Sequence, residues 1–172
     1  PGEEAEVEAN TLAYDGEADV IGAQGRVVMR YAGYTLHCDD LRYEQQTGAL
    51  QCIGNGEVVD PQGTVYRADR FEVTGGMKQA FVDSLTLTTT DGAMITAASV
   101  HYESELESVF VDASYSPCGL CIDEKGNRIG WRVKAAKLVQ NGETKTIYLE
   151  QPSLEILGMP VAWLPFLYMP DP

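Results

Sequence analysis

Apolar and polar residues alternate along almost the whole of this chain. Segments in which every second residue is apolar are separated by Gly, Asn, Asp and Pro, and no long stretch keeps the three-and-four spacing of an amphipathic helix. Val, Thr, Ile and Tyr, which favour strands, are spread throughout. The pattern therefore predicts an all-β protein.

A short motif recurs within this alternation. It consists of a small residue, one or two polar residues, an apolar residue, and a second apolar or aromatic residue two positions later. Five copies at near-regular spacing indicate a repeated structural unit, and the last copy is the weakest; they cover residues 9–14, 38–43, 68–73, 97–102 and 135–140.

The spacing inside the motif predicts a kink in each strand. The small residue and the next apolar residue are three positions apart, so a regular strand would place them on opposite faces. A β-bulge or kink at the intervening Asn or Asp position would return both to one face. The residues that we expect on this inward face are Leu12, Tyr14, Leu36, Cys38, Leu41, Tyr43, Tyr66, Ala68, Phe71, Val73, Ile95, Ala97, Val100 and Tyr102.

Turn signals between the copies predict how the strands connect. They are Asp15-Gly16, Thr47-Gly48, Pro61-Gln62-Gly63, Gly75-Gly76 and Asp91-Gly92. Such turns join short strands into successive antiparallel layers, and 172 residues is an ordinary length for one β domain. We therefore expect a β-jellyroll or β-taco. Its inward face is either a packed core or a lipid groove, in which the small residues leave space between the large ones.

Charge narrows the classes of partner. The chain carries 26 acidic and 12 basic residues, a formal net charge of −14, and such a surface repels a nucleic-acid backbone. No apolar run is long enough for a transmembrane helix, and the first eight residues do not resemble a signal peptide, so we expect a soluble chain. Gly54-Asn55-Gly56 lacks the rest of a phosphate-binding loop.

The four cysteines are candidates for disulfides. Cys118 and Cys121 form a CxxC motif, which suggests redox exchange or half of a zinc site, but the chain shows neither a βαβ pattern nor a second ligand pair. A loop disulfide, or thiols that pair elsewhere, is the favoured interpretation. Cys38 and Cys52 flank a hairpin centred near Gln45 and could approach closely, although two buried, unreactive thiols fit equally well.

Nothing in the sequence predicts an enzyme. His37 and His101 fall on expected strands without a clustered partner, as surface or core histidines do. Glu103, Glu105 and Glu107 alternate as on one solvated strand face. We therefore expect no catalytic site, no metal and no cofactor.

The repeat, together with residues 52–58 and 60–65, resembles the OstA-like domain of proteins that move lipopolysaccharide (LPS) between bacterial membranes, over nearly the whole chain. The order of features in the C-terminal third is more specific. Tyr115-Ser116-Pro117-Cys118, then Trp131, then residues 157–166 resemble the N-terminal periplasmic domain of the LptD family of outer-membrane LPS-assembly proteins.

This resemblance implies a function and a set of partners. Residues 1–157 would form the periplasmic jellyroll, and residues 158–172 a stiff, Pro-rich exit to a transmembrane β-barrel that is missing from this sequence. Acyl chains would travel inside the jellyroll, driven by a distant inner-membrane ATPase. The partners would be LPS, a bridge protein that adds a strand near Val7 to Tyr14, the barrel and its lipoprotein, at the periplasmic face of the outer membrane.

The resemblance also concerns the cysteines. LptD proteins have a cysteine near Cys118 that pairs with a barrel cysteine, so Cys118 or Cys121 would do the same. This chain departs from the family pattern because it lacks a cysteine at its extreme N-terminus and has two at this position.

Three alternatives remain at the level of sequence. A free-standing periplasmic or inner-membrane LPS carrier would share the repeat but lack the signatures at Trp131 and Pro160 to Pro165. A structural β-solenoid or adhesin module would use the inward face as a dry core. A thiol oxidoreductase would use Cys118 and Cys121.

Overall fold

The computed structural model describes residues 5–74, 79–103, 107–117, 124–127 and 130–170. In this part of the chain all regular structure is strand, and the strands form one antiparallel 14-stranded sheet, which confirms the predicted fold class. No helix there is long and apolar enough to cross a membrane. The strands are β1 (Glu6–Glu8), β2 (Thr11–Asp15), β3 (Val20–Tyr31), β4 (Tyr34–Glu44), β5 (Leu50–Val59), β6 (Val65–Val73), β7 (Gln79–Thr88), β8 (Met94–Glu103), β9 (Glu107–Ser116), β10 (Trp131–Asn141), β11 (Thr146–Glu150), β12 (Ser153–Ile156), β13 (Met159–Trp163) and β14 (Phe166–Pro170).

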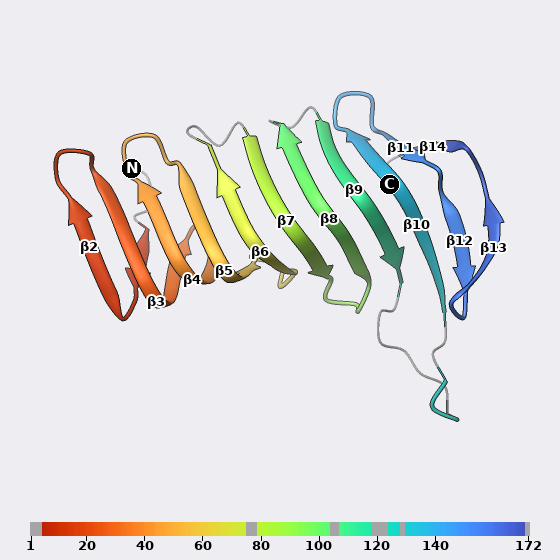
Figure 1. Ribbon diagram of the computed structural model, residues 1–172, viewed down its shortest axis with the longest axis horizontal. Coiled ribbons are helices and arrows are strands. Elements are labelled where there is room, and N and C mark those ends of the chain that lie inside the picture. The colour runs from red at the N-terminus through yellow and green to blue at the C-terminus, as the bar shows by residue number, and fades with distance from the viewer. Residues whose placement is uncertain (1–4, 75–78, 104–106, 118–123, 128–129, 171–172) are drawn as a thin grey trace.

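The strands lie side by side in chain order, with the N-terminal strands at one end and the C-terminal strands at the other (Figure 1). At the N-terminal end, β1 and β2 both pair with β3, along different parts of its length. At the C-terminal end, β11 and β12 share β10 in the same way, and β14 and β13 continue them. Each end of the sheet is therefore split into two short edge strands.

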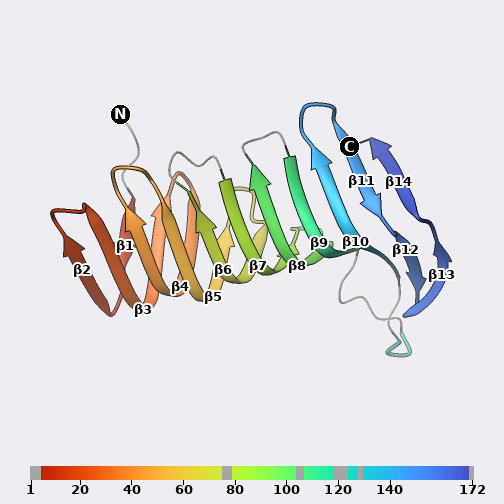
Figure 2. The ribbon, with the colours of Figure 1, turned by 45° about the horizontal axis from the view of Figure 1, so that its top comes forward.

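The split arises because the long strands bend near their middles, and the bends line up across the sheet (Figure 2). Arg26, Asn55, Ser84 and Asp112 have φ values of 49°, 48°, 58° and 49°, and they lie on β3, β5, β7 and β9, every second strand. A positive φ breaks the regular pleat and turns the chain. The sheet consequently folds over on itself into two walls.

We name the walls by the edge strands they contain. Wall A holds β2, β11 and β14 with the adjoining halves of the long strands, and wall B holds β1, β12 and β13 with the other halves. The two walls face each other, because one buried cluster draws Leu41 and Phe71 from wall A and Met29 and Leu36 from wall B. This is the predicted taco arrangement.

Within the motif, the small residue and the apolar residue three positions later both face inward, as expected. The bulges that carry an extra residue, however, lie on other strands. Cys38 and Leu41 are both buried although they are three residues apart, as the kink requires. Among the long strands, the register shifts place the extra residue on β3, between Gln24 and Val27, and on β5, between Ile53 and Gly56. The repeated motif marks β2, β4, β6, β8 and β10, whereas these bulges fall on the strands between the copies.

The turns agree with most of the turn signals, with three differences. Asp15-Gly16, Thr47-Gly48, Pro61-Gln62-Gly63 and Asp91-Gly92 lie between successive strands, and Gly75-Gly76 falls outside the described residues. The strands from β3 to β10 are nine to twelve residues long rather than short, since each spans both walls. A turn at Ala32-Gly33, where φ is 51° and 83°, carries no sequence signal that we used.

The third difference concerns the acidic residues near the end of β8. Glu103 and Glu107 do not alternate on one strand, because they are cross-strand neighbours on β8 and β9. Glu105 lies outside the described residues. The apparent alternation ran from one strand to the next.

Candidate functional site

Two continuous apolar rows line the inside of the sheet from one end to the other. Each row follows cross-strand neighbours through successive registers. The wall A row is Leu12, Ala23, Leu41, Cys52, Phe71, Val82, Val100, Phe110, Leu138, Leu149 and Leu167. The wall B row is Val7, Met29, Leu36, Val58, Tyr66, Leu87, Ile95, Tyr115, Val133, Leu154 and Ala162.

The interior of the described chain contains no charge. No polar or charged residue is buried there, whereas the adjacent outward positions of wall B are polar, as at Arg67, Thr86, Thr96 and Lys134. Each ion pair of the described residues has an exposed basic side chain, for example Arg67, whose Nε lies 3.1 Å from Glu57 Oε2. The fold therefore encloses an apolar surface and keeps its charges outside.

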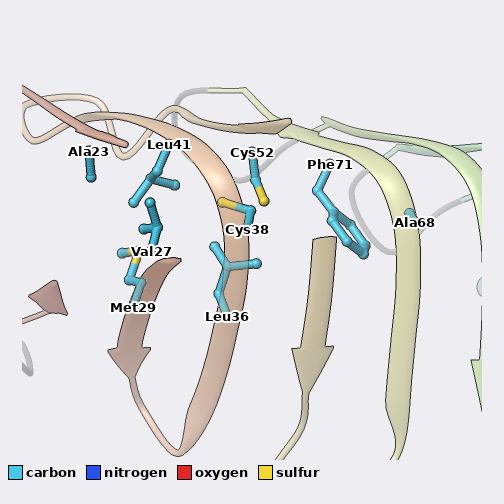
Figure 3. Close-up of a cluster of buried hydrophobic side chains, with 9 residues drawn as sticks. All are labelled: Ala23, Val27, Met29, Leu36, Cys38, Leu41, Cys52, Ala68 and Phe71. Atoms are coloured by element: carbon cyan, nitrogen blue, oxygen red, sulfur yellow. The ribbon is translucent and has the colours of Figure 1, made fainter. Parts of the chain in front are cut away.

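The N-terminal half of this interior is closed by packing. Side chains from β3 to β6 form one cluster in which Leu41 and Cys52 have no exposed surface and Val27 is 1% exposed (Figure 3). Side chains packed at this density leave no space for a ligand. A guest molecule could enter here only if the walls moved apart.

Packing becomes thinner toward the C-terminal half. A second, smaller cluster holds Leu85, Ala97 and Val100 on β7 and β8. On β9 and β10 the buried inward residues are Ala113 and Ala135, which are cross-strand neighbours. The larger residues around them are less buried: Val133 and Leu138 are half-buried, Phe110 is half-buried and packs against the second cluster, and Tyr115 is 39% exposed. We call these inward residues of β9 and β10 the open half.

A separate apolar cavity lies at the N-terminal end, between β1 and β2. Its volume is about 340 Å³, and it is lined by Ala5, Val7, Leu12, Ala13, Tyr14 and Ile21. Leu12 and Tyr14 are more than half exposed because no further strand covers β2. The Tyr14 hydroxyl donates to Asp19 Oδ1 at 2.9 Å, and this hydrogen bond to a carboxylate raises the pKa of Tyr14.

Both ends of the sheet present a backbone edge. The Asn10 N–H donates to the Gly25 carbonyl at 2.8 Å, so alternation directs the backbone groups of Thr11 and Ala13 away from β3. At the other end, the Gln151 N–H donates to the Pro165 carbonyl at 2.9 Å, and the same alternation directs those of Tyr168 away from β11. These edges could accept an added strand.

The C-terminal edge strands are apolar as well as exposed. Every residue of β13 and β14 is exposed, including Met159 and Tyr168 at 66% and Trp163 at 62%. Residues 156–170 contain no charged side chain. The segment that we expected as an exit from the jellyroll takes part in its sheet, because β13 pairs with β12 and β14 pairs with β11.

In the structure the fourteen candidate residues lie on the inward side of the sheet, but they differ in burial. Those that are buried are Leu36, Cys38, Leu41, Ala68, Phe71, Ala97 and Val100. Tyr43, Tyr66, Val73, Ile95 and Tyr102 are half-buried, and Leu12 and Tyr14 are exposed. Contact of any of them with lipid stays a prediction.

Sequence reasoning missed most of the open half. Phe110, Ala113 and Tyr115 lie on β9, which lies between two copies of the motif. A signal was available, because Phe110 and Ala113 repeat the three-residue spacing around a polar residue at Asp112. The core residues Ala23 and Val27 were missed for a different reason, since the extra residue on β3 makes their spacing four.

The structure describes only two of the four cysteines. Cys38 and Cys52 are buried free thiols, and the hydrogen bond with Cys38, together with burial, raises the pKa of Cys52. They are not direct cross-strand neighbours, because Cys52 pairs with Leu41. Cys118 and Cys121 lie outside the described residues. In the described part of the chain, no group of His, Cys, Asp or Glu is arranged to hold a metal ion.

Comparison with known proteins gives one distant likeness. Neither a protein-family model nor a curated protein matches the chain. Among solved structures, it is similar to LptH of Pseudomonas aeruginosa, described as the LptA-homologous periplasmic component of the LPS transport device. The two share 12% identity over 90% of this chain and 95% of LptH, with a TM-score of 0.36. A likeness this distant does not assign a function.

Proposed function

We propose that this chain transports lipopolysaccharide, with the acyl chains held between the two walls and the saccharide left in water. The observation that supports the proposal is the pair of apolar rows that cross the whole described sheet. A dry core needs to be apolar only where it is enclosed, but here the rows continue to the exposed end positions Leu12 and Leu167.

The physical basis is the burial of hydrocarbon. Moving one methylene from water into an apolar site is worth about 0.8 kcal/mol, so a lipid with several acyl chains gains much from such a surface. No bond has to be made or broken for this. The absence of buried charge in the described interior suits this role, because hydrocarbon that covered an unpaired charge would remove its hydration at a large cost in free energy.

Acyl chains bind first in the open half. Ala113 and Ala135 leave room, and half-buried Phe110 and Leu138 offer apolar surface that still contacts water. In the closed half, passage of lipid requires the walls to separate and the cluster around Leu41 to give up its contacts. Occupancy by LPS would replace those contacts with lipid contacts of the same kind, so the net cost of opening is small.

The finer assignment is to the LptD-type role. In this role the chain receives LPS from a bridge protein at the β1 and β2 end and passes it to a β-barrel beyond residue 172. Two features support this: the ordered signatures from Tyr115 to residue 166, and the exposed, charge-free strands β13 and β14, which suit an apolar continuation. A free-standing LPS carrier would use the same interior, and the sequence encoded after residue 172 distinguishes the two.

Photo-crosslinking at adjacent residues tests the transport proposal. Phe110 and Leu138 point inward, whereas their neighbours Val109 and Val139 are paired with each other on the outward face and are also apolar. A photoreactive amino acid at Phe110 or Leu138 is expected to capture LPS in cells, and one at Val109 or Val139 is not. Equal capture from both faces contradicts the proposal.

A purified-lipid experiment identifies the part of LPS that is bound. The protein that carries the photoreactive amino acid at position 110 is expected to crosslink to lipid A but not to the deacylated saccharide. Labelling by the saccharide alone would show that the interior is not an acyl site.

A further inference from the structure

Two buried thiols lie close together at the bend between the walls. Cys38 lies on β4 in wall B, as the cross-strand neighbour of Val27, and Cys52 lies on β5 in wall A, as the neighbour of Leu41 and Phe71. The chain of β4 turns between Cys38 and Leu41, and this turn brings Cys38 toward β5. In Figure 3 the two side chains lie next to each other inside the cluster, with the Cys52 sulfur directed toward the Cys38 side chain.

The other contacts of these sulfur atoms are weak. Cys38 Sγ lies 3.4 Å from the Asp40 carbonyl oxygen, and Cys52 Sγ lies 3.9 Å from the His37 carbonyl oxygen. A thiol is a poor hydrogen-bond donor, so these contacts add little stability. The contact with His37 places the Cys52 sulfur against the backbone next to Cys38, and the nearby Cys38 thiol raises the pKa of Cys52.

We propose that Cys38 and Cys52 form a disulfide bond that ties wall A to wall B at the bend. The two thiols lose two protons and two electrons as the S–S bond forms, and a disulfide donor such as oxidised glutathione takes up the electrons and becomes two thiols. The inference rests on the proposed function only for the compartment, because a periplasmic chain meets such oxidants.

Burial determines when the bond can form and break. Cys38 is 4% exposed and Cys52 is fully buried, so an oxidant or reductant cannot reach them in the folded protein. The bond therefore forms during folding and resists reduction afterwards. The bond would hold β4 and β5 in register at the bend, while the parts of the two walls farthest from the bend remain free to separate for lipid.

A refolding experiment tests the bond directly. The full chain carrying Cys118→Ser and Cys121→Ser is unfolded, reduced and refolded in a glutathione buffer, so that only Cys38 and Cys52 can react. We expect no titratable thiol under denaturing, non-reducing conditions, a mass lower by two hydrogen atoms, and a crosslinked peptide that contains both cysteines. Two free thiols in the refolded, folded protein overturn the proposal.

A second measurement shows whether the disulfide bond stabilises the folded protein. Cys38→Ala/Cys52→Ala, made in the same background, is expected to melt about 5–10 °C below the oxidised protein, because the crosslink restricts the unfolded chain. The reduced protein should melt close to this variant. Oxidised and reduced proteins with one melting temperature would overturn the tie. Lipid capture at Phe110 reports separately on the transport proposal, and either result can fail without the other.

Discussion

Gly56 is the point on the inner surface where a side chain is least tolerated. A Cβ atom there would lie 2.7 Å from two ring atoms of Phe71 and 2.9 Å from the Ala68 carbonyl oxygen. The backbone oxygen cannot move without disturbing the β5–β6 pairing, and the Phe71 ring is held in the closed half. The absence of a side chain at this position therefore lets the inner faces of β5 and β6 pack.

Gly56→Ala is accordingly expected to destabilise the protein by about 1–3 kcal/mol, the usual cost of overpacking. Chemical denaturation followed by circular dichroism measures this loss. Gly22→Ala is the matched control, because no atom lies within 4 Å of its added Cβ and its φ is not positive. The control should be neutral or slightly stabilising. A Gly56→Ala variant as stable as Gly22→Ala would mean that the closed half is not tightly packed.

At the level of elements, the edge strand β2 combines two exposed surfaces. Its inward side chains Leu12 and Tyr14 line the N-terminal cavity, and the backbone groups of Thr11 and Ala13 point away from β3. A partner strand added at this edge would pair with these groups and extend the wall A row. Binding and continuity of the apolar surface would thus come from the same contact.

Proline substitutions on β2 test this role. Thr11→Pro and Ala13→Pro each remove an outward N–H while the bonds to β3 remain, so each should weaken binding of a bridge protein about fivefold, the value of one hydrogen bond near 1 kcal/mol. Leu12→Pro is the contrasting variant, because it removes a bond to β3 and should destabilise the hairpin. Calorimetric titration with thermal melts reports both effects. Unchanged binding in both outward variants excludes this edge.

At the level of the whole molecule, packing decreases from the N-terminal to the C-terminal half. The largest buried cluster joins β3 to β6, and on β9 and β10 the buried inward residues are alanines. Regions with few buried apolar contacts open more readily than a packed core. The domain is therefore expected to open from its C-terminal half while the bend at β4 and β5 stays closed.

Hydrogen exchange measures this difference. Amides at the centres of β4 and β5, near Leu41 and Cys52, should exchange most slowly, and those of β9 and β10, near Ala113 and Ala135, should exchange faster. Addition of LPS should slow exchange mainly in β9 and β10, since lipid would supply the missing contacts there. Uniform protection along the sheet would contradict the proposed open half.

The sequence alone determined the class of structure and the inward face. Alternation with a period of two can be satisfied only by strands, and the three-residue spacing of Cys38 and Leu41 requires a change of phase, so both features follow from local geometry. Turn residues fixed most of the strand order because antiparallel neighbours are joined directly.

The tertiary structure decided how that inward face is used. Packing density depends on which side chains meet across the two walls. Leu41 of wall A and Leu36 of wall B belong to one buried cluster, whereas Phe110 and Ala135 lie on β9 and β10 in the open half. The bulges on β3 and β5 and the approach of Cys38 to Cys52 depend on the same folding of the sheet. The sequence pattern is nearly equal in the two halves. The division into a closed half and an open half arises only when wall A faces wall B, because the space between the walls is filled by side chains that come together only when the strands bend.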